Sequence, residues 1–275
     1  MYKFQHLQFV NWYFKKADKN LLISKTLFGF KILLPVWRSS THKLLALQGE
    51  SFIKEKDLVK SLIRKGDVVF DIGANIGYSA LLFAKCVGEF GKVLCFEPDN
   101  NNFSEISNTI SMNNLKRVTL LNVAVGDSNG TVEFVSGLNA RVSWPEDHDK
   151  LEIQSVCLDD YAKEKPNFIK IDVEGFEAQV LRGMAKIISE HKPTLFLEVH
   201  PHLLNYGYSV DDVLRILFEY KSVRAFEEKI HKRFWGKMKS AYLGIDKIRE
   251  LKITDVQLEV RSGKRKRPFW LVCKG

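Results

Sequence analysis

Short runs of β-prone residues alternate with segments of helical periodicity through the middle of the chain. The runs lie at 68–72, 92–98, 118–125, 168–174 and 193–200. Between them, apolar residues recur at helical spacing, for example at Phe103, Ile106 and Ile110. Strands that alternate with helices in this way favour a parallel sheet covered on both faces. We therefore predict a doubly wound α/β fold with a mostly parallel, seven-stranded sheet.

The pattern differs before the first of these runs. Residues 2–14 place aromatic and aliphatic side chains on one helical stripe, and the segments 30–34 and 43–47 are short β-prone runs around a proline-containing turn. We predict an N-terminal helix and an antiparallel hairpin, which together form an extension over residues 1–60. The main domain is then expected over residues 61–275.

Two further regions have a β-prone pattern. Residues 131–135 and 153–157 predict strands of an insertion, and the polar loop 137–149 between them either reaches over the active site or lies on the surface. Beyond the fifth run, we expect a helix over 210–220 and three strands, two of which, 256–260 and 269–272, are paired through the basic turn 261–267. That turn either binds phosphate or keeps a sheet edge soluble.

The first run ends in a glycine-containing turn, Asp71-Ile-Gly-Ala-Asn-Ile-Gly77. Gly73 and Gly77 flank Asn75, and glycines allow the backbone to turn sharply and to approach a bound molecule. Residues 78–85 then have the composition of a helix, whose first N–H groups would face that molecule. The turn therefore predicts a ligand-binding site.

Glu97 ends the second run, twenty residues after Gly77. A carboxylate at this place in a doubly wound sheet accepts hydrogen bonds from the two hydroxyls of an adenosine ribose. NAD and S-adenosylmethionine both contain that ribose. The turn lacks the G-x-G-x-x-G pyrophosphate cradle and carries Asp71 before its first glycine, so it favours the sulfonium cofactor.

Charged residues continue into the fourth and fifth runs. Lys170, Asp172 and Glu174 alternate with apolar residues, and the fifth run ends on Glu198 and His200. Buried charges need partners or a function, and ligands bind at the carboxyl ends of strands in such sheets. His200 has the most suitable ordinary pKa for a general base. Asp172, Glu174 and Glu198 are alternatives. Asp172 could instead contact the cofactor, and His200 could instead orient Glu198 or the Pro201 loop.

Four motifs together carry a family resemblance: residues 71–77, 96–98, 170–177 and 197–200. In combination they resemble the FkbM-type family of S-adenosylmethionine-dependent methyltransferases, from about Phe28 onward. The resemblance implies a class I methyltransferase fold, which is Rossmann-like, and methyl transfer to a hydroxyl of a carbohydrate or secondary metabolite. It also implies that Asn122 to Ala124 lie in the adenine pocket, although Asn122 could equally cap the strand end. The expected cofactor site is Asp71, Gly73, Asn75, Gly77, Glu97, Asn122, Ala124 and Asp172.

Charge is distributed unevenly along the chain. Residues 1–66 hold 13 Lys or Arg against 4 Asp or Glu, residues 67–220 hold 13 against 23, and residues 221–275 hold 16 against 6. The two basic ends could attract an anionic partner, such as nucleic acid, a sugar phosphate or a membrane face, or could be ordinary solvated surface. We expect a small-molecule or glycan acceptor held by the 137–149 loop and the basic C-terminal region.

Other functions are less consistent with these motifs. A nucleic-acid methyltransferase is the main alternative, but the sequence has neither an N-P-P-Y-like motif nor a catalytic cysteine motif. A non-catalytic module for an adenosine ligand would not need the acids Glu97, Asp172 and Glu198. The turn disfavours an NAD-dependent dehydrogenase, and the methyl transfer itself requires no metal.

Composition places further bounds on the protein. With 45% hydrophobic residues in 275, the chain can bury one large core with a small appended unit. Its four cysteines are scattered, which indicates neither a disulfide framework nor a zinc ligand set. No apolar run reaches the length of a membrane-spanning helix, and the N-terminus lacks the pattern of a signal peptide. We expect a cytoplasmic location, with peripheral membrane contact through the aromatic N-terminal segment as an alternative to a packed lid.

Overall fold

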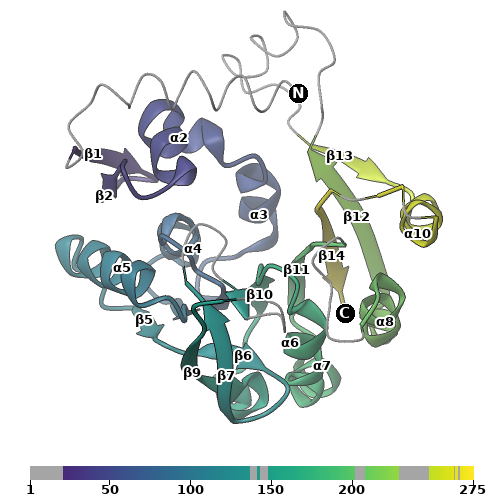
Figure 1. Cartoon of the computed structure of the whole chain (residues 1–275). Coiled ribbons are helices and arrows are strands. Elements are labelled where there is room, and N and C mark those ends of the chain that lie inside the picture. Colours follow the sequence, from purple (N-terminus) through teal and green to yellow (C-terminus); the bar gives the residue numbers. More distant parts are fainter. Residues whose placement is uncertain are drawn as a thin grey trace, which may run out of the picture.

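The computed structural model describes residues 21–136, 141–142, 148–201, 208–228, 248–262, 264–265 and 267–275. Its central feature is a sheet with the spatial order β5-β4-β3-β10-β11-β14-β12-β13 (Figure 1). These strands are β3 (Val68–Ile72), β4 (Lys92–Phe96), β5 (Val118–Leu121), β10 (Phe168–Ile171), β11 (Thr194–Val199), β12 (Ser222–Glu228), β13 (Ile248–Leu251) and β14 (Phe269–Lys274). The predicted helix at residues 2–14 lies outside the described residues.

The strand directions confirm the predicted doubly wound, mostly parallel sheet. The strands from β5 to β11 are parallel, and β14 runs antiparallel between β11 and β12. In the middle, Asp71 of β3 lies opposite Cys95 of β4 and Lys170 of β10. β4, which follows β3 in the sequence, pairs with one edge of β3, and β10, which comes later, pairs with the other edge. The carboxyl ends of these strands therefore border the crevice where such sheets bind ligands.

The sheet has one strand more than the predicted seven. The additional strand, β13, pairs antiparallel with the outer edge of β12. Its cross-strand contacts are ionic, since Arg224 pairs with Glu250 and Arg249 pairs with Glu227. A charged edge strand lacks the apolar alternation by which a strand is identified in a sequence, which is why the prediction omitted it.

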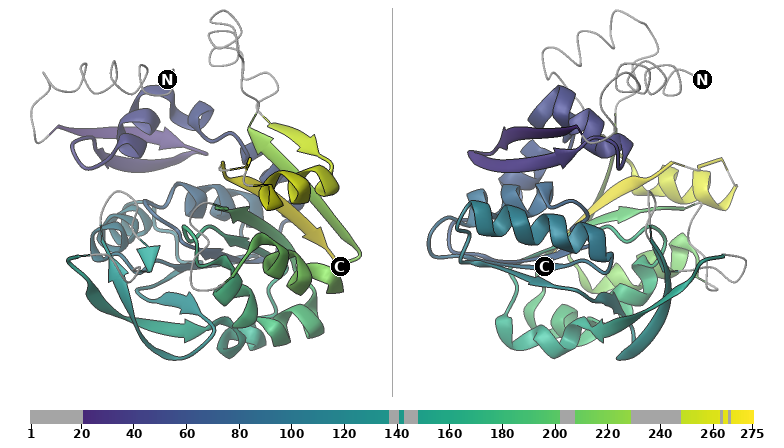
Figure 2. Two further views of the ribbon diagram at one scale, coloured as in Figure 1. Left: turned by 45° about the vertical axis from the view of Figure 1, so that its right-hand side comes forward. Right: turned by 60° about the vertical axis from the view of Figure 1, so that its left-hand side comes forward.

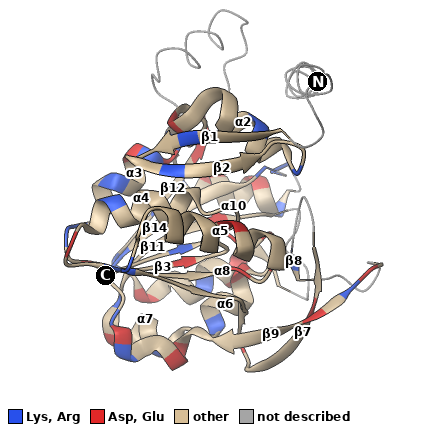
Figure 3. Cartoon of the chain, turned by 90° about the vertical axis from the view of Figure 1, so that its left-hand side faces the viewer, with Lys and Arg blue, Asp and Glu red and all other residues tan. Residues whose placement is uncertain are grey.

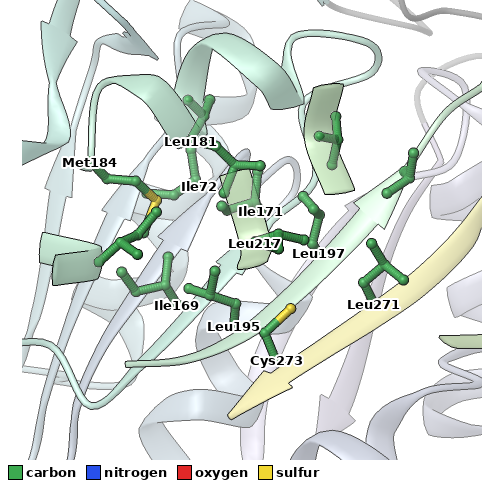
Figure 4. Packing of buried hydrophobic residues seen from close by; sticks show 14 of the residues in the cluster. Ile72, Ile169, Ile171, Leu181, Met184, Leu195, Leu197, Leu217, Leu271 and Cys273 are labelled. Atoms are coloured by element: carbon green, nitrogen blue, oxygen red, sulfur yellow. The ribbon is translucent and has the colours of Figure 1, made fainter. Parts of the chain in front are cut away.

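Helices cover both faces of the sheet. One face packs against α3 (Lys56–Leu62), α4 (Tyr78–Val87) and α5 (Asn100–Met112), and the other against α6 (Glu177–Arg182), α7 (Ala185–His191) and α8 (Val210–Ile216). Successive strand residues point to opposite faces, so Val69 belongs to the first core and Phe70 to the second. Figure 4 shows the second core, where Ile169 and Leu195 of the sheet lie near Met184.

A second, smaller sheet follows the order β6-β9-β7-β8. Its strands are β6 (Ala124–Gly126), β7 (Gly130–Val135), β8 (Arg141–Val142) and β9 (Leu151–Cys157). The predicted insertion strands at 131–135 and 153–157 are confirmed. The single strand expected over 118–125 is instead two, because β5 stays in the main sheet while β6 pairs with β9. Residues 137–140 and 143–147 of the intervening loop lie outside the described part.

The N-terminal hairpin is present, but with other strands than predicted. It consists of β1 (Leu22–Leu27) and β2 (Phe30–Pro35), joined by Phe28 and Gly29. Both turn residues have positive φ, 54° and 91°, as a two-residue type I′ turn requires. Phenylalanine is unusual at such a position, so the sequence did not indicate a turn there. In both views of Figure 2 the hairpin lies on the α4 and α5 side of the main sheet.

The prediction of a strand over 43–47 is wrong, because this segment belongs to the helix α2 (Ser40–Gln48). Ser39 caps the helix, and its hydroxyl accepts a hydrogen bond from the backbone N–H of His42. The hairpin and α2 share a hydrophobic cluster with α4 and the main sheet. The division into residues 1–60 and 61–275 stays a prediction.

The expected strand over 256–260 is also a helix, α10 (Ile253–Arg261). Val256 is buried, and Ile253 and Val260 pack against the same cluster. Their spacing of three and four residues is that of one helix face, whereas their β-branched side chains led to the strand prediction. The turn 261–267 therefore does not connect two strands.

Three short 3₁₀ helices complete the described elements: η1 (Gly49–Phe52), η2 (Leu158–Glu164) and η3 (Leu217–Glu219). Within the described part of the chain, no helix has the length and apolar character needed to cross a membrane.

Candidate functional site

A cavity of about 330 Å³ opens at the carboxyl ends of β3, β4 and β10. Its walls come from the turns after these strands, from β6, β7 and β8, from the first turn of α5, and from the first turn of α2 with the two residues before it. The lining includes the following polar or turn residues and Ala124: Arg38, His42, Gly73, Asn75, Glu97, Ala124, Arg141, Asp172 and Glu174.

The turn after β3 has a backbone that only certain residues can adopt. Gly73, Asn75 and Gly77 have φ values of 77°, 53° and 85°. At Gly73 a Cβ atom would lie 2.0 Å from the carbonyl oxygen of Asp172. The N–H groups of Gly73 and Ala74 both donate to the carbonyl of Phe96, which ties the turn to the end of β4. The turn is thus fixed between β4 and β10.

Glu97 holds the opposite side of this turn. Its side chain accepts hydrogen bonds from the backbone N–H of Asn75 at 2.7 Å, the backbone N–H of Asp99 at 3.0 Å and the amide of Asn102 at 3.3 Å. Glu97 is 3% exposed. Burial raises the pKa of Glu97 to about 7, although these hydrogen bonds oppose the increase. Glu97 both organises the turn and presents a carboxylate to the cavity.

Lys170 lies between two acids beneath the cavity floor. Its Nζ atom is 3.7 Å from Asp71 Oδ1, 3.2 Å from Asp172 Oδ2 and 3.4 Å from the carbonyl oxygen of Gly73. Burial lowers the pKa of Lys170, but the charges of Asp172 and Asp71 outweigh it and raise the pKa overall. Burial raises the pKa of Asp172, whereas Lys170 and His200 lower it below its ordinary value. Asp172 is therefore ionised at neutral pH.

Asp71 is fully buried and accepts a hydrogen bond from Ser79 Oγ at 2.6 Å. Burial raises the pKa of Asp71, while Lys170 and Ser79 oppose the increase. Its position below the turn makes it a support for β3, α4 and Lys170.

His200 lies in a second charged cluster beside the first. Its Nδ1 atom is 2.8 Å from Glu177 Oε1, and its Nε2 atom is 3.5 Å from Glu174 Oε2, 3.8 Å from Glu198 Oε1 and 4.0 Å from Asp172 Oδ1. Burial lowers the pKa of His200, but the hydrogen bond to Glu177 and the surrounding carboxylates raise it to about 10. The imidazole is consequently protonated at neutral pH.

Glu198 is the partner of Trp270, whose indole N–H donates to Glu198 Oε2 at 3.0 Å. Burial and the negative charge of Asp172 raise the pKa of Glu198 to about 8. Glu174 has a positive φ of 51°, an uncommon conformation for a residue other than glycine, and burial raises its pKa. Asp172, Glu174 and His200 each place one potential metal-ligand atom within 4.8 Å of the others.

The structure brings together most of the residues that the sequence analysis selected. Five of the predicted cofactor residues line the cavity: Gly73, Asn75, Glu97, Ala124 and Asp172. Asp71 and Gly77 lie in the supporting strand and turn. Asn122 does not line the cavity, and its amide donates to the carbonyls of Glu97 and Pro98. His200 and Glu198 lie outside the lining. His200 faces the cavity residues Asp172 and Glu174, and Glu198 lies beside His200. Their proposed roles remain predictions.

One wall of the cavity was not anticipated. Arg38 and His42 line it and both pair with Glu105 of α5, with His42 Nε2 2.8 Å from the carboxylate. Arg38 also lies 3.9 Å from Asp99, the residue that caps α5. These contacts join residues more than sixty positions apart, so periodicity could not reveal them. The Ser39 cap was the local signal that a helix begins beside the site.

The basic C-terminal region does not contribute to the cavity where it is described, because no described residue after Phe176 lines it. Many of its basic side chains instead pair with acids: Arg224 with Glu250, Arg249 with Glu227, Arg261 with Asp211 and Arg265 with Glu259. Figure 3 also marks basic residues on β1, β2 and α3. Residues 229–247 of this region lie outside the described part of the chain, so its expected role in the acceptor site stays a prediction.

Comparison with known proteins agrees with this architecture. Residues 71–224, over half of the chain, match the family model of the methyltransferase FkbM domain. Hexuronic acid methyltransferase AglP of Haloferax volcanii is 27% identical over 179 residues, which cover 61% of this chain and 69% of that protein. 2-O-methyltransferase NoeI of Sinorhizobium fredii is 27% identical over 158 residues, which cover 48% of this chain and 64% of that protein.

A solved FkbM methyltransferase from Methylobacillus flagellatus is 23% identical, with a TM-score of 0.45 over 69% of this chain and 52% of that one. The chain thus spans less than two thirds of NoeI and about half of the solved protein. On the match to the family model, this protein is a member of the FkbM methyltransferase family.

Proposed function

We propose that the protein transfers the methyl group of S-adenosylmethionine to a hydroxyl oxygen of a carbohydrate. The observation that carries the cofactor assignment is the position of Glu97. It lies at the end of β4, lines the cavity and binds the Gly73–Gly77 turn through Asn75. A carboxylate in this place can accept hydrogen bonds from the two ribose hydroxyls of the cofactor.

The charge of the cavity supports a cationic cofactor. S-adenosylmethionine carries a sulfonium and an ammonium group, and Asp172 and Glu174 form part of the wall. Asp172 is ionised at neutral pH for the reasons given above. An ionised carboxylate attracts a nearby cation, most strongly where burial excludes water. In this arrangement Asp172 contacts the amino-acid end of the cofactor, and Ala124 lies beside the adenine.

The acceptor class follows from the relatives and from two arginines. AglP is a methyltransferase of hexuronic acid and NoeI is a 2-O-methyltransferase, so both names describe methylation of sugar-type or hydroxyl acceptors. In this chain Arg38 and Arg141 line the same cavity as Asp172, where Arg38 also pairs with Glu105 and Arg141 donates to the carbonyl of Val142. A guanidinium group suits the carboxylate of a sugar acid. We therefore include uronic acids among the acceptors.

The transfer is an in-line displacement in which the acceptor oxygen forms a C–O bond as the C–S bond of the sulfonium breaks. The protein must align the two reactants and remove the hydroxyl proton. His200 was predicted as the base, but a protonated imidazole cannot accept a second proton. Methyl transfer therefore requires one of two events. Either His200 loses its proton when the cofactor and the acceptor bind, or another group promotes ionisation of the acceptor hydroxyl.

Glu97→Gln tests the cofactor assignment. An amide at this position places an NH₂ group against backbone N–H donors or against the ribose, so we expect the affinity for S-adenosylhomocysteine to fall about 10- to 100-fold. Isothermal titration calorimetry measures this directly. Glu250→Gln, a change in an exposed ion pair with Arg224, is the matched control and should bind as the unmodified protein does. Equal affinity of the Glu97 variant and the control would remove the ribose assignment.

A further inference from the structure

Four side chains from the ends of β10 and β11 converge beside the cavity at an unusual spacing. His200 Nε2 faces oxygens of Glu174, Glu198 and Asp172 at 3.5, 3.8 and 4.0 Å. Two atoms that bind one metal ion at about 2.0–2.3 Å each lie roughly 3 to 4.4 Å apart. The spacing is that of ligands around a shared cation.

A buried carboxylate fixes the orientation of His200. Glu177 is fully buried, and its Oε1 atom accepts hydrogen bonds from the backbone N–H of Gly175 at 3.1 Å and from His200 Nδ1 at 2.8 Å. A histidine that ligates a metal commonly donates its other ring N–H to a carboxylate in this way. The pairing sets the tautomer and turns Nε2 toward Asp172 and Glu174.

Carboxyl groups outnumber cationic side chains around this point. Two cationic side chains, Lys170 and His200, contact five carboxylates of the described residues: Asp71, Asp172, Glu174, Glu177 and Glu198. Two buried oxygens of these acids, Asp71 Oδ1 and Glu177 Oε2, have no hydrogen-bond partner within the described part of the chain. A buried group of acids is costly unless its members hold protons or share a further cation.

We propose that Asp172, Glu174 and His200 bind a divalent metal cation at the edge of the cofactor cavity, with Glu198 beside them and Glu177 as the positioning residue. The ion displaces the proton that His200 Nε2 carries in the metal-free protein, so binding releases a proton. Carboxylate oxygens together with one imidazole nitrogen suit an ion of the Mn²⁺ or Mg²⁺ class. Asp172 and Glu174 line the cavity, so the ion is reachable by an acceptor bound there.

The role of the cation rests on the proposed function. A metal ion that coordinates the acceptor hydroxyl lowers its pKa, so the proton leaves to solvent water. The electron pair of the resulting oxygen forms the new C–O bond, and the electron pair of the C–S bond stays on sulfur. This route supplies an ionised oxygen without requiring His200 to act as the base.

Metal binding can be measured without cofactor or acceptor. The full chain is dialysed against a chelator, freed of the chelator and titrated with Mn²⁺, while the electron paramagnetic resonance signal of free Mn²⁺ is recorded. We expect about one bound ion per chain. Glu174→Gln should weaken binding at least tenfold, and Glu177→Gln about 10- to 100-fold, because it removes the orienting carboxylate.

Glu250→Gln is the control for both changes and should bind Mn²⁺ as the unmodified chain does. Glu174 lies at the cavity rather than in the core, so its variant should fold, and circular dichroism checks both variants. The absence of a stoichiometric ion, or unchanged binding by a folded Glu174→Gln variant, overturns the site.

Methyl transfer provides the second arm. Chelation should lower transfer to a sugar acceptor at least tenfold, and Mn²⁺ or Mg²⁺ should restore it. Unchanged transfer after chelation would refute the metal role while the proposed function stands. Mn²⁺ binding with no methylation of any sugar hydroxyl would support the metal site and refute the proposed function.

Discussion

Gly73→Ala is expected to destabilise the protein and to abolish measurable cofactor binding. The added Cβ would lie 2.0 Å from the backbone oxygen of Asp172, and the φ of 77° is unfavourable for alanine. The left-handed backbone costs about 1–2 kcal/mol and the steric overlap about 1–3 kcal/mol. Since backbone atoms at the ends of β3 and β10 must separate, the turn that lines the cavity should lose its shape.

Urea denaturation measures the first effect and calorimetry with S-adenosylhomocysteine the second. We expect the free energy of unfolding to fall by roughly 2–5 kcal/mol and the affinity to fall more than 100-fold. Gly66→Ala is the matched control, because Gly66 has a φ of 90° but no atom within 4 Å of its Cβ position. In the control, the free energy of unfolding should fall only by the amount that the left-handed backbone costs, about 1–2 kcal/mol. If both variants lost the same stability and both bound the ligand normally, the close approach at Gly73 would be unimportant.

Asp172→Asn is expected to cause the largest loss of methyl transfer with little loss of fold. Asp172 lines the cavity, contacts Lys170 and faces His200. Asparagine keeps the shape but removes the negative charge that faces either the cofactor or a bound cation. Lys170 retains Asp71 as a partner. We therefore expect the rate to fall by about 10²- to 10⁴-fold, as for removal of a group that acts in the transition state.

Single-turnover transfer from labelled S-adenosylmethionine measures this change, and the thermal midpoint monitors the fold. Asp211→Asn is the control, since Asp211 forms an exposed ion pair with Arg261 and should leave the rate unchanged. A rate for Asp172→Asn within about threefold of the control would exclude Asp172 from the chemistry.

The central strands could be predicted because each is a short apolar run between glycine, proline or charged residues. Val68–Ile72 and Phe168–Ile171 are buried on both faces, and such strands leave a strong sequence signal. The segments 43–47 and 256–260 were wrongly predicted as strands. Over so few residues, the positions of their apolar side chains fit the period of a helix as well as that of a strand. The Ser39 cap stabilises a helix in the first segment, and the burial of Val256 stabilises a helix in the second.

The site was predictable where it follows the strand ends, since Glu97, Asp172 and His200 each come directly after a buried run. The wall formed by Arg38 and His42 depends on Glu105, which is remote in sequence. Glu177 was part of a recognised motif, but its role depends on contact with His200. The sequence shows an acid at the start of the apolar α6 segment, but its full burial, which marks a positioning residue, is visible only in the structure.

The central claim is that a carbohydrate hydroxyl accepts the methyl group. The most direct measurement incubates the protein with S-adenosylmethionine labelled at the methyl carbon and with separate pools of sugars, including uronic acids, other small metabolites and nucleic acid. We predict that label enters the sugar pool as an O-methyl ether. Label found only in nucleic acid, or on nitrogen or carbon of another metabolite, would contradict the proposed function.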